Sequence, residues 1–174
     1  EPLAREQEVM DALSKRLASL DKLERNWQDV AIPNDTLETI IKLVDRFAAG
    51  VPPLPRGILL WGPPGTGKTL IARKLAQHVE CNFVAVTIAD LKAEYIGQTG
   101  PKVKKLWTDA RSKGPTILFV DECESAFARR GGRDTDTFGN ELVQTFIAEW
   151  DGFNQGGGNV LVIGATNRRE LIDD

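Results

Sequence analysis

The sequence predicts a three-layer α/β fold, a parallel β-sheet covered by helices on both faces. Short apolar runs alternate along the chain with segments whose apolar residues recur at helical spacing, which is typical of consecutive βαβ units. The runs are apolar throughout rather than alternating with polar residues, which indicates strands buried on both faces. With 174 residues, of which 41% are hydrophobic and 27% charged, the chain is long enough to bury one core.

Residues 3–27 predict a charged helix with apolar residues at Leu3, Met10, Leu13, Leu17, Leu20 and Trp27. The three-then-four spacing from Met10 to Leu20 forms a heptad seam, which Glu24 interrupts. Residues 1–28 are therefore expected to form a linker helix or a short coiled coil. A helix packed on the main domain is an equally supported alternative, because so few heptads specify little.

A second helix is expected to begin at Asn34 or Asp35, because both residue types cap helix N-termini. Gly50 would end it. Residues 51–55 contain three prolines and predict a stiff connector into the first strand. The buried face of the helix would consist of Leu37, Ile40, Ile41, Val44 and Phe47.

Four apolar runs predict buried strands at residues 58–61, 83–86, 117–120 and 160–163. Three further helices are expected: one after the first strand, one with Pro101 in its first turn, and one before the fourth strand. Their apolar faces would be formed by Leu70, Ile71, Leu75 and Val79; by Val103, Leu106, Trp107 and Ala110; and by Phe138, Leu142, Phe146, Ile147 and Trp150. Residues 129–134 predict a polar loop, and the glycines at 152 and 156–158 predict a turn.

The residues that link the first strand to its helix read GPPGTGKT, from Gly62 to Thr69. They fit G-x-x-x-x-G-K-[ST], the phosphate-binding loop (P-loop) of nucleoside-triphosphatases. Glycines let the backbone N–H groups turn inward as an anion nest, and the following helix adds the positive end of its dipole. ATP and Mg²⁺ are the expected cofactors. The expected fold is the parallel sheet of P-loop NTPases. Nucleotide contacts are expected from Pro64, Gly65, Thr66, Gly67, Lys68, Thr69 and Leu70.

Specific roles follow for the polar residues of this loop and of two strand ends. Lys68 supplies a mobile positive charge for the β- and γ-phosphates, and the Thr69 hydroxyl is placed to bind Mg²⁺. Asp121 and Glu122 follow the third strand, where open α/β sheets place their ligand crevice. Asp121 is expected to hold Mg²⁺ through water, and Glu122 to polarise the water that attacks the γ-phosphate. Asn167 follows the fourth strand, where its amide could contact that water and the phosphate or simply form a turn.

These segments together resemble the AAA family of ATPases over roughly residues 29–174. The resemblance is carried by residues 62–69, 117–122, 149–152 and 162–168. It implies that residues 29–174 form the large subdomain of an AAA module, that Asn167 is the catalytic sensor-1 residue beside Lys68 and Glu122, and that Asp29 and Ala31 contact adenine. In the family an arginine finger, a fifth strand and a helical lid follow sensor 1. Because none of them precedes Asp174, this stretch alone is expected to hydrolyse ATP poorly and to leave one sheet edge open.

Tyr95, Ile96 and Gly97 resemble the pore loop of the family's rings, which implies a homo-hexamer that threads a polypeptide substrate. An aromatic ring on a loop can grip an extended peptide, although a tyrosine packed on its own domain is the alternative. Residues 94–102 also resemble red-type Rubisco activases, whereas the regions around residues 131–132 and 151–152 look more like protein unfoldases. The subfamily therefore stays open.

The expected function is ATP hydrolysis coupled to remodelling or unfolding of a protein substrate. Two alternatives are a nucleic-acid motor or clamp-loader ATPase and a ring scaffold that binds ATP with little turnover. The net charge of −3 and the pI of about 5.3 disfavour nucleic acid, and the complete set of catalytic residues disfavours the scaffold. No apolar run reaches membrane-spanning length, and the two cysteines, Cys81 and Cys123, favour a reducing cytoplasm.

Overall fold

The computed structural model describes residues 2–91, 98–125, 137–152 and 160–172. The chain divides into two compact units, Glu1–Ala31 and Ile32–Asp174. The first unit contains helix α1 (Pro2–Asn26), in which Val9, Met10, Leu13 and Leu17 are exposed. The linker-helix or coiled-coil role of residues 1–28 stays a prediction from their sequence.

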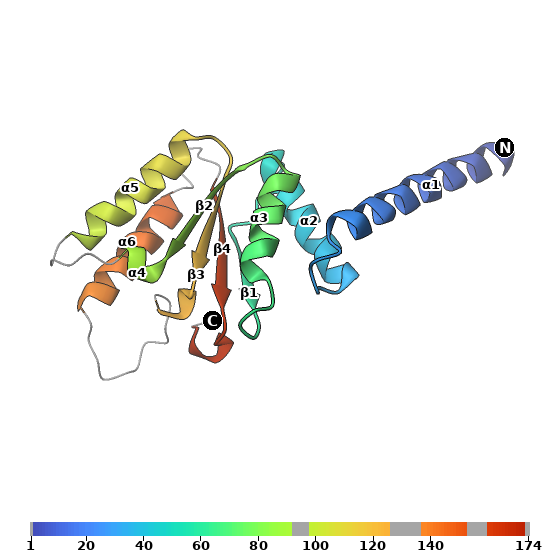
Figure 1. The fold of residues 1–174 in the computed structure, drawn as a ribbon. Helices are drawn as coiled ribbons and strands as arrows, with labels where there is room; N and C mark the ends of the chain where they lie inside the picture. Colours follow the sequence, from blue (N-terminus) through green and yellow to red (C-terminus); the bar gives the residue numbers. More distant parts are fainter. Residues whose placement is uncertain (1, 92–97, 126–136, 153–159, 173–174) are drawn as a thin grey trace. The chain divides into compact units, whose positions relative to one another are not determined.

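The second unit is built on a parallel sheet whose strands, within the described residues, lie in the order β1-β4-β3-β2. The strands are β1 (Gly57–Trp61), β2 (Asn82–Thr87), β3 (Thr116–Asp121) and β4 (Val160–Thr166). The helices are α2 (Asn34–Ala48), α3 (Lys68–His78), α4 (Ile88–Leu91), α5 (Thr99–Ser112) and α6 (Thr137–Gly152). Helices α5 and α6 cover one face of the sheet, and α3 covers the other (Figure 1). The predicted three-layer α/β fold with a parallel sheet is confirmed.

The two central strands explain why the sequence shows no alternation of polar and apolar residues. Leu118 and Val120 of β3 belong to the cluster formed with Trp107 of α5 and Phe146 of α6. Since successive side chains of a strand point to opposite faces, the buried neighbours of Leu118 and Val120 lie on the α3 side. Strands β3 and β4 are therefore covered on both faces, as their composition predicted.

The prediction of a buried first strand is wrong for β1. This strand lies at an edge of the described sheet, and Leu59 and Trp61 are 37% and 67% exposed. An apolar run gives no information about strand order, so it cannot distinguish an edge strand from a central one. An open edge at β1 agrees with the expectation drawn from the family resemblance. Ile147 was also assigned to the buried side of its helix, but it is 37% exposed because it lies one residue around the helix from Phe146.

Helix α2 buries the predicted face but begins differently from the prediction. Its first residue is Asn34 and its N-cap is Pro33, with no hydrogen bond from a capping side chain. The prediction that Asn34 or Asp35 caps the helix is therefore wrong; Asp35 Oδ1 accepts the adjacent Thr36 N–H at 2.8 Å. Gly50 ends the helix as predicted, with a φ of +65° that favours glycine.

The segments expected to form the pore loop at residues 95–97, the polar loop at 129–134 and the glycine turn at 156–158 lie outside the described residues. Within the described part of the chain, no helix combines the length and the apolar character needed to cross a membrane.

Candidate functional site

The carboxyl ends of β1, β4 and β3 lie next to one another along one edge of the sheet (Figure 1). In the register of the sheet, Trp61 pairs with Thr166 and Val120 pairs with Gly164. The loop after β1, the turn after β4 and Asp121 at the end of β3 therefore emerge at the same edge. The strand order brings together three of the segments that the sequence predicts to carry chemistry.

Thr166 fixes two of these segments to each other. Its carbonyl oxygen accepts the N–H of Gly62, the first residue of the phosphate-binding loop, at 3.3 Å. Its hydroxyl accepts the N–H of Arg168 at 2.9 Å, across the turn that presents the exposed Asn167. The sequence reasoning missed this buried threonine. The available signal was a hydroxyl residue directly before a turn, where it can bond the backbone two residues on.

The shape of the phosphate-binding loop depends on its glycines. Gly65 and Gly67 have φ values of +76° and +82°, a left-handed conformation that a β-carbon disfavours. Between them, the Thr66 hydroxyl donates to the carbonyl oxygen of Pro63 at 2.8 Å, which holds the loop closed across its base. Pro64 lies exposed on this turn.

Helix α3 begins at the end of this loop and offers free donors there. No side chain caps its N-terminus, and the first hydrogen bond of the helix joins the Ile71 N–H to the Gly67 carbonyl at 2.9 Å. The N–H groups of Lys68, Thr69 and Leu70 therefore have no acceptor within the helix. Such donors at the positive end of a helix dipole suit a phosphate group.

The Lys68 ammonium adds a full positive charge to these donors. It donates to the carbonyl oxygens of Gly62 and Pro63 at 3.0 and 2.9 Å, and lies 3.4 Å from the Thr66 hydroxyl. These contacts hold the charge over the loop rather than out in solvent. The loop, the helix terminus and Lys68 thus fit a polyphosphate.

Glu122 has an unusual backbone conformation, which the sequence did not reveal. Its φ is +52°, in the left-handed region that glycine normally occupies. Two hydrogen bonds support this turn, from the Glu122 N–H to Asp121 Oδ1 at 2.9 Å and from the Ser125 N–H to the Glu122 carbonyl at 3.0 Å. Such strain costs on the order of 1–3 kcal/mol and clusters at active sites. The turn directs the chain sharply away from β3 and leaves Glu122 exposed.

Cys123 anchors this turn in the hydrophobic core. Its side chain is 1% exposed, and burial, with the nearby Glu124 charge, raises the pKa of its thiol to about 12. The thiol is therefore protonated and is a packing group rather than a nucleophile. A β-carbon on Gly164 of β4 would lie 3.2 Å from its sulfur, so the glycine makes room for Cys123.

The residues proposed for Mg²⁺ are an exposed hydroxyl, Thr69, and a partly buried carboxylate, Asp121. Among the described residues, His, Cys, Asp and Glu side chains form no group of three or more that could enclose a metal ion. Magnesium in nucleotide sites is held by one or two protein oxygens, with phosphate oxygens and water completing its shell. This sparse set of oxygen donors fits that mode of binding.

The position of five predicted residues relative to this edge stays a prediction. Asp29 and Ala31 belong to the first compact unit, Glu1–Ala31, and their contact with adenine stays a prediction. Tyr95, Ile96 and Gly97 lie outside the described residues.

Comparison with known proteins gives consistent results. The chain is 37% identical over 169 residues to the proteasome-activating nucleotidase of Methanosphaerula palustris, covering 95% of this chain and 40% of that protein. It is 38% identical over 141 residues to the peroxisomal ATPase PEX6 of Kluyveromyces lactis, covering 80% of this chain and 14% of that protein. The chain thus spans less than half the length of these relatives.

Solved structures show the same architecture. The AAA domain of FIGL-1 in complex with ADP superposes with a TM-score of 0.70 at 29% identity, covering 85% of this chain and 50% of that one. A model of the ATPase family associated with various cellular activities (AAA) matches residues 58–174, from β1 past the turn that carries Asn167. The chain belongs to this family of AAA ATPases.

Proposed function

We propose that this chain is the ATP-hydrolysing module of a ring-forming protein remodeller. The proposal rests on one observation: the carboxyl ends of β1, β4 and β3 lie side by side at the same end of the sheet. Phosphate donors, a carboxylate pair and an amide lie at or after these strand ends in the sequence, and phosphoryl transfer depends on the positioning of such groups.

Each group has a distinct task in this proposal. Lys68 and the free N–H groups at the start of α3 bind the phosphates of ATP. Glu122 orients the attacking water and takes its proton, while Asn167 steadies that water and the γ-phosphate. Thr69 and Asp121 would hold Mg²⁺, which when bound neutralises charge on the phosphate oxygens.

A polypeptide substrate and a hexameric ring complete the proposal. One relative is named a proteasome-activating nucleotidase, and a second, from Schizosaccharomyces pombe and 34% identical over 170 residues, is named as a homolog of 26S proteasome regulatory subunit 8. The pore-loop resemblance of Tyr95, Ile96 and Gly97 also supports a polypeptide substrate. We also propose that the protein acts in the cytoplasm.

Substituting Glu122 tests the hydrolytic role. In a version of the protein extended through the family's lid, Glu122→Gln should lower MgATP turnover by about 10²–10⁴-fold, because the water loses its base. ATP binding should persist, since the phosphate donors are untouched. Glu124→Gln is the matched control, because it makes the same chemical change two residues along the same turn and should retain turnover.

Two further results would contradict the proposal. Turnover that survives in Glu122→Gln would show that another group positions the water. A permanently unfolded polypeptide should stimulate turnover, whereas single-stranded DNA should not; stimulation by DNA alone would favour the nucleic-acid motor instead.

A further inference from the structure

A carboxylate from another helix, Glu141 of α6, caps the first turn of α5. The residue at its N-cap, Gln98, makes no capping hydrogen bond with its side chain. Instead, the N–H of Gly100 donates to Glu141 Oε1 at 3.2 Å, across 41 residues of sequence. Glu141 lies near the start of α6, so one carboxylate joins the beginnings of two helices. A negative charge at a helix N-terminus also interacts favourably with the helix dipole.

Gly100 is shaped for this contact. A β-carbon at this position would lie 3.0 Å from Glu141 Oε1 and 3.5 Å from the Thr145 hydroxyl. Gly100 is buried and its backbone is not left-handed, so its conformation does not require glycine. Glycine is a poor helix former, and its presence here is explained by the space that the carboxylate needs.

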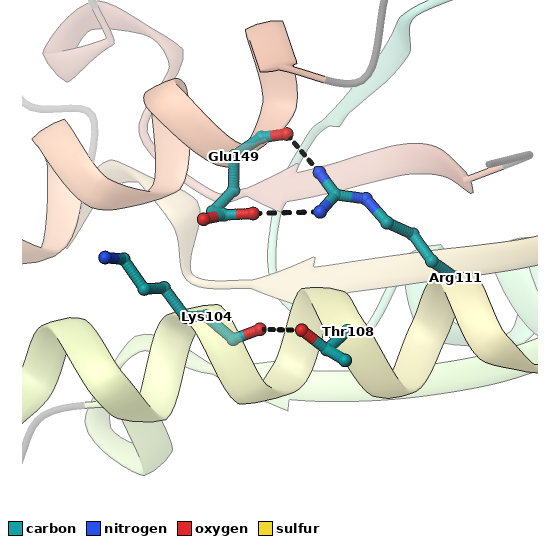
Figure 2. Close-up of polar contacts among 4 residues, drawn as sticks. All are labelled: Lys104, Thr108, Arg111 and Glu149. Atoms are coloured by element: carbon teal, nitrogen blue, oxygen red, sulfur yellow. Dashed lines mark hydrogen bonds and ion pairs between the residues drawn. The ribbon is translucent and has the colours of Figure 1, made fainter. Parts of the chain in front are cut away.

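The rest of the α5–α6 pair is held independently of Glu141. At the opposite end, the Arg111 guanidinium donates to Glu149 Oε2 at 2.9 Å and to the Glu149 backbone carbonyl (Figure 2). Between the two ends, the Trp107 and Phe146 rings pack edge to face with their centroids 5.3 Å apart. Loss of the Glu141 contact would therefore loosen the first turn of α5 while the two helices stay together.

We infer that Glu141 is a positioning residue. By holding the first turn of α5, it links α6 to the binding of a polypeptide substrate. Gln98 alone separates α5 from Tyr95, Ile96 and Gly97, for which we propose polypeptide contact. In the sequence, α6 follows the turn that carries Glu122, with residues 126–136 between them. The hydrogen bond from the Gly100 N–H to Glu141 therefore joins the two helices that follow these segments in the sequence. This inference rests on the proposed function.

The test compares basal and polypeptide-stimulated ATP turnover in the full-length protein, with a permanently unfolded polypeptide as the probe. Glu141→Ala should leave basal turnover within about twofold and reduce the stimulation about fivefold or more, the usual size of an energetic coupling between sites. Glu141→Gln should retain most of the stimulation, because its amide oxygen can still accept the Gly100 N–H. Gln144→Ala, at an exposed position on the same helix, is the matched control and should behave as wild type.

Hydrogen exchange gives a readout that does not depend on activity. The amides of residues 99–102 should exchange faster in Glu141→Ala than in wild type, and not in Gln144→Ala. Gly100→Ala should also reduce the stimulation, because its β-carbon would lie 3.0 Å from Glu141 Oε1 and the carboxylate must shift to make room. Added to Glu141→Ala, it should cause little further loss, since both changes break one contact.

Tyr95→Ala separates failure of this inference from failure of the proposed function. If Tyr95→Ala abolishes stimulation and Glu141→Ala does not, the Glu141 link is wrong and the proposed function stands. If stimulation persists in Tyr95→Ala, the polypeptide-gripping role is wrong and the coupling inference falls with it. Equal loss of basal and stimulated turnover in Glu141→Ala would assign Glu141 a merely structural role and overturn the inference.

Discussion

Backbone conformation at single glycines shapes the phosphate-binding loop. At Gly65 a β-carbon would meet no other protein atom within 4 Å, so the φ of +76°, rather than crowding within the chain, favours glycine there. Gly114, in the turn between α5 and β3, has a φ of +84° and the same open surroundings. The two positions therefore differ in location but not in local strain.

Alanine at these two glycines should separate backbone strain from nucleotide binding. Gly65→Ala and Gly114→Ala should each lower the free energy of unfolding by about 1–2 kcal/mol, as measured by urea denaturation. Only Gly65→Ala should also weaken binding of a fluorescent ADP analogue, by about tenfold, because it reorients the N–H groups of the loop. Equal losses of affinity in the two variants would show that the loop geometry is not what binds the phosphates.

The residues at the site differ in how far their sequence could predict them. The glycines, Lys68 and Thr69 were predictable because their spacing is dictated by phosphate geometry. The left-handed turn at Glu122 was not, because glutamate has no preference for that conformation; neighbouring hydrogen bonds and the burial of Cys123 support it. Thr166 and Glu141 act through residues distant in sequence, and local patterns contain no signal for such contacts.

At the scale of elements, Arg111 and Glu149 join α5 to α6 near the C-terminal ends of both helices. The guanidinium of Arg111 also stacks over the Trp107 ring, 5.3 Å from its centroid. Its two hydrogen bonds to Glu149 join a planar fork to two acceptors (Figure 2). An ammonium group cannot reproduce that geometry.

Removing the guanidinium should measurably weaken the fold. Arg111→Ala should lower the free energy of unfolding by about 1–3 kcal/mol, because half-buried acceptors on Glu149 lose their donor. Arg111→Lys should recover only part of this loss. Lys104→Ala removes a cation from the same helix whose side chain makes none of the contacts drawn in Figure 2, and it should change stability little. A loss in Lys104→Ala as large as that in Arg111→Ala would mean that net charge, not the contact, matters.

Elements were predictable where periodicity and length agreed, and less so at their boundaries. Strands β3 and β4 and helices α3 and α5 occur where their apolar patterns placed them. The N-cap of α2 was mispredicted because Pro33, Asn34 and Asp35 compete for one boundary, and composition does not decide among them. The exposure of β1 followed from strand order, which depends on long-range packing rather than on the strand's own residues.

At the scale of the whole molecule, the catalytic groups proposed here, Lys68, Glu122 and Asn167, follow three neighbouring strands of the described sheet, and an arginine finger would complete them. The family resemblance implies that this arginine comes from a neighbouring subunit. Such a residue contributes roughly 10³–10⁵-fold in rate where it has been measured. Catalysis should therefore depend on assembly of several copies of the protein.

The most direct test measures MgATP turnover per subunit against protein concentration. Two proteins would be compared, residues 1–174 and a version extended through the lid that the resemblance implies. We predict that turnover per subunit by the extended protein rises steeply with concentration, as rings form, while residues 1–174 stay near background. Activity per subunit that is flat and equal in the two proteins would contradict the ring ATPase and favour a site that works within one subunit or only binds ATP.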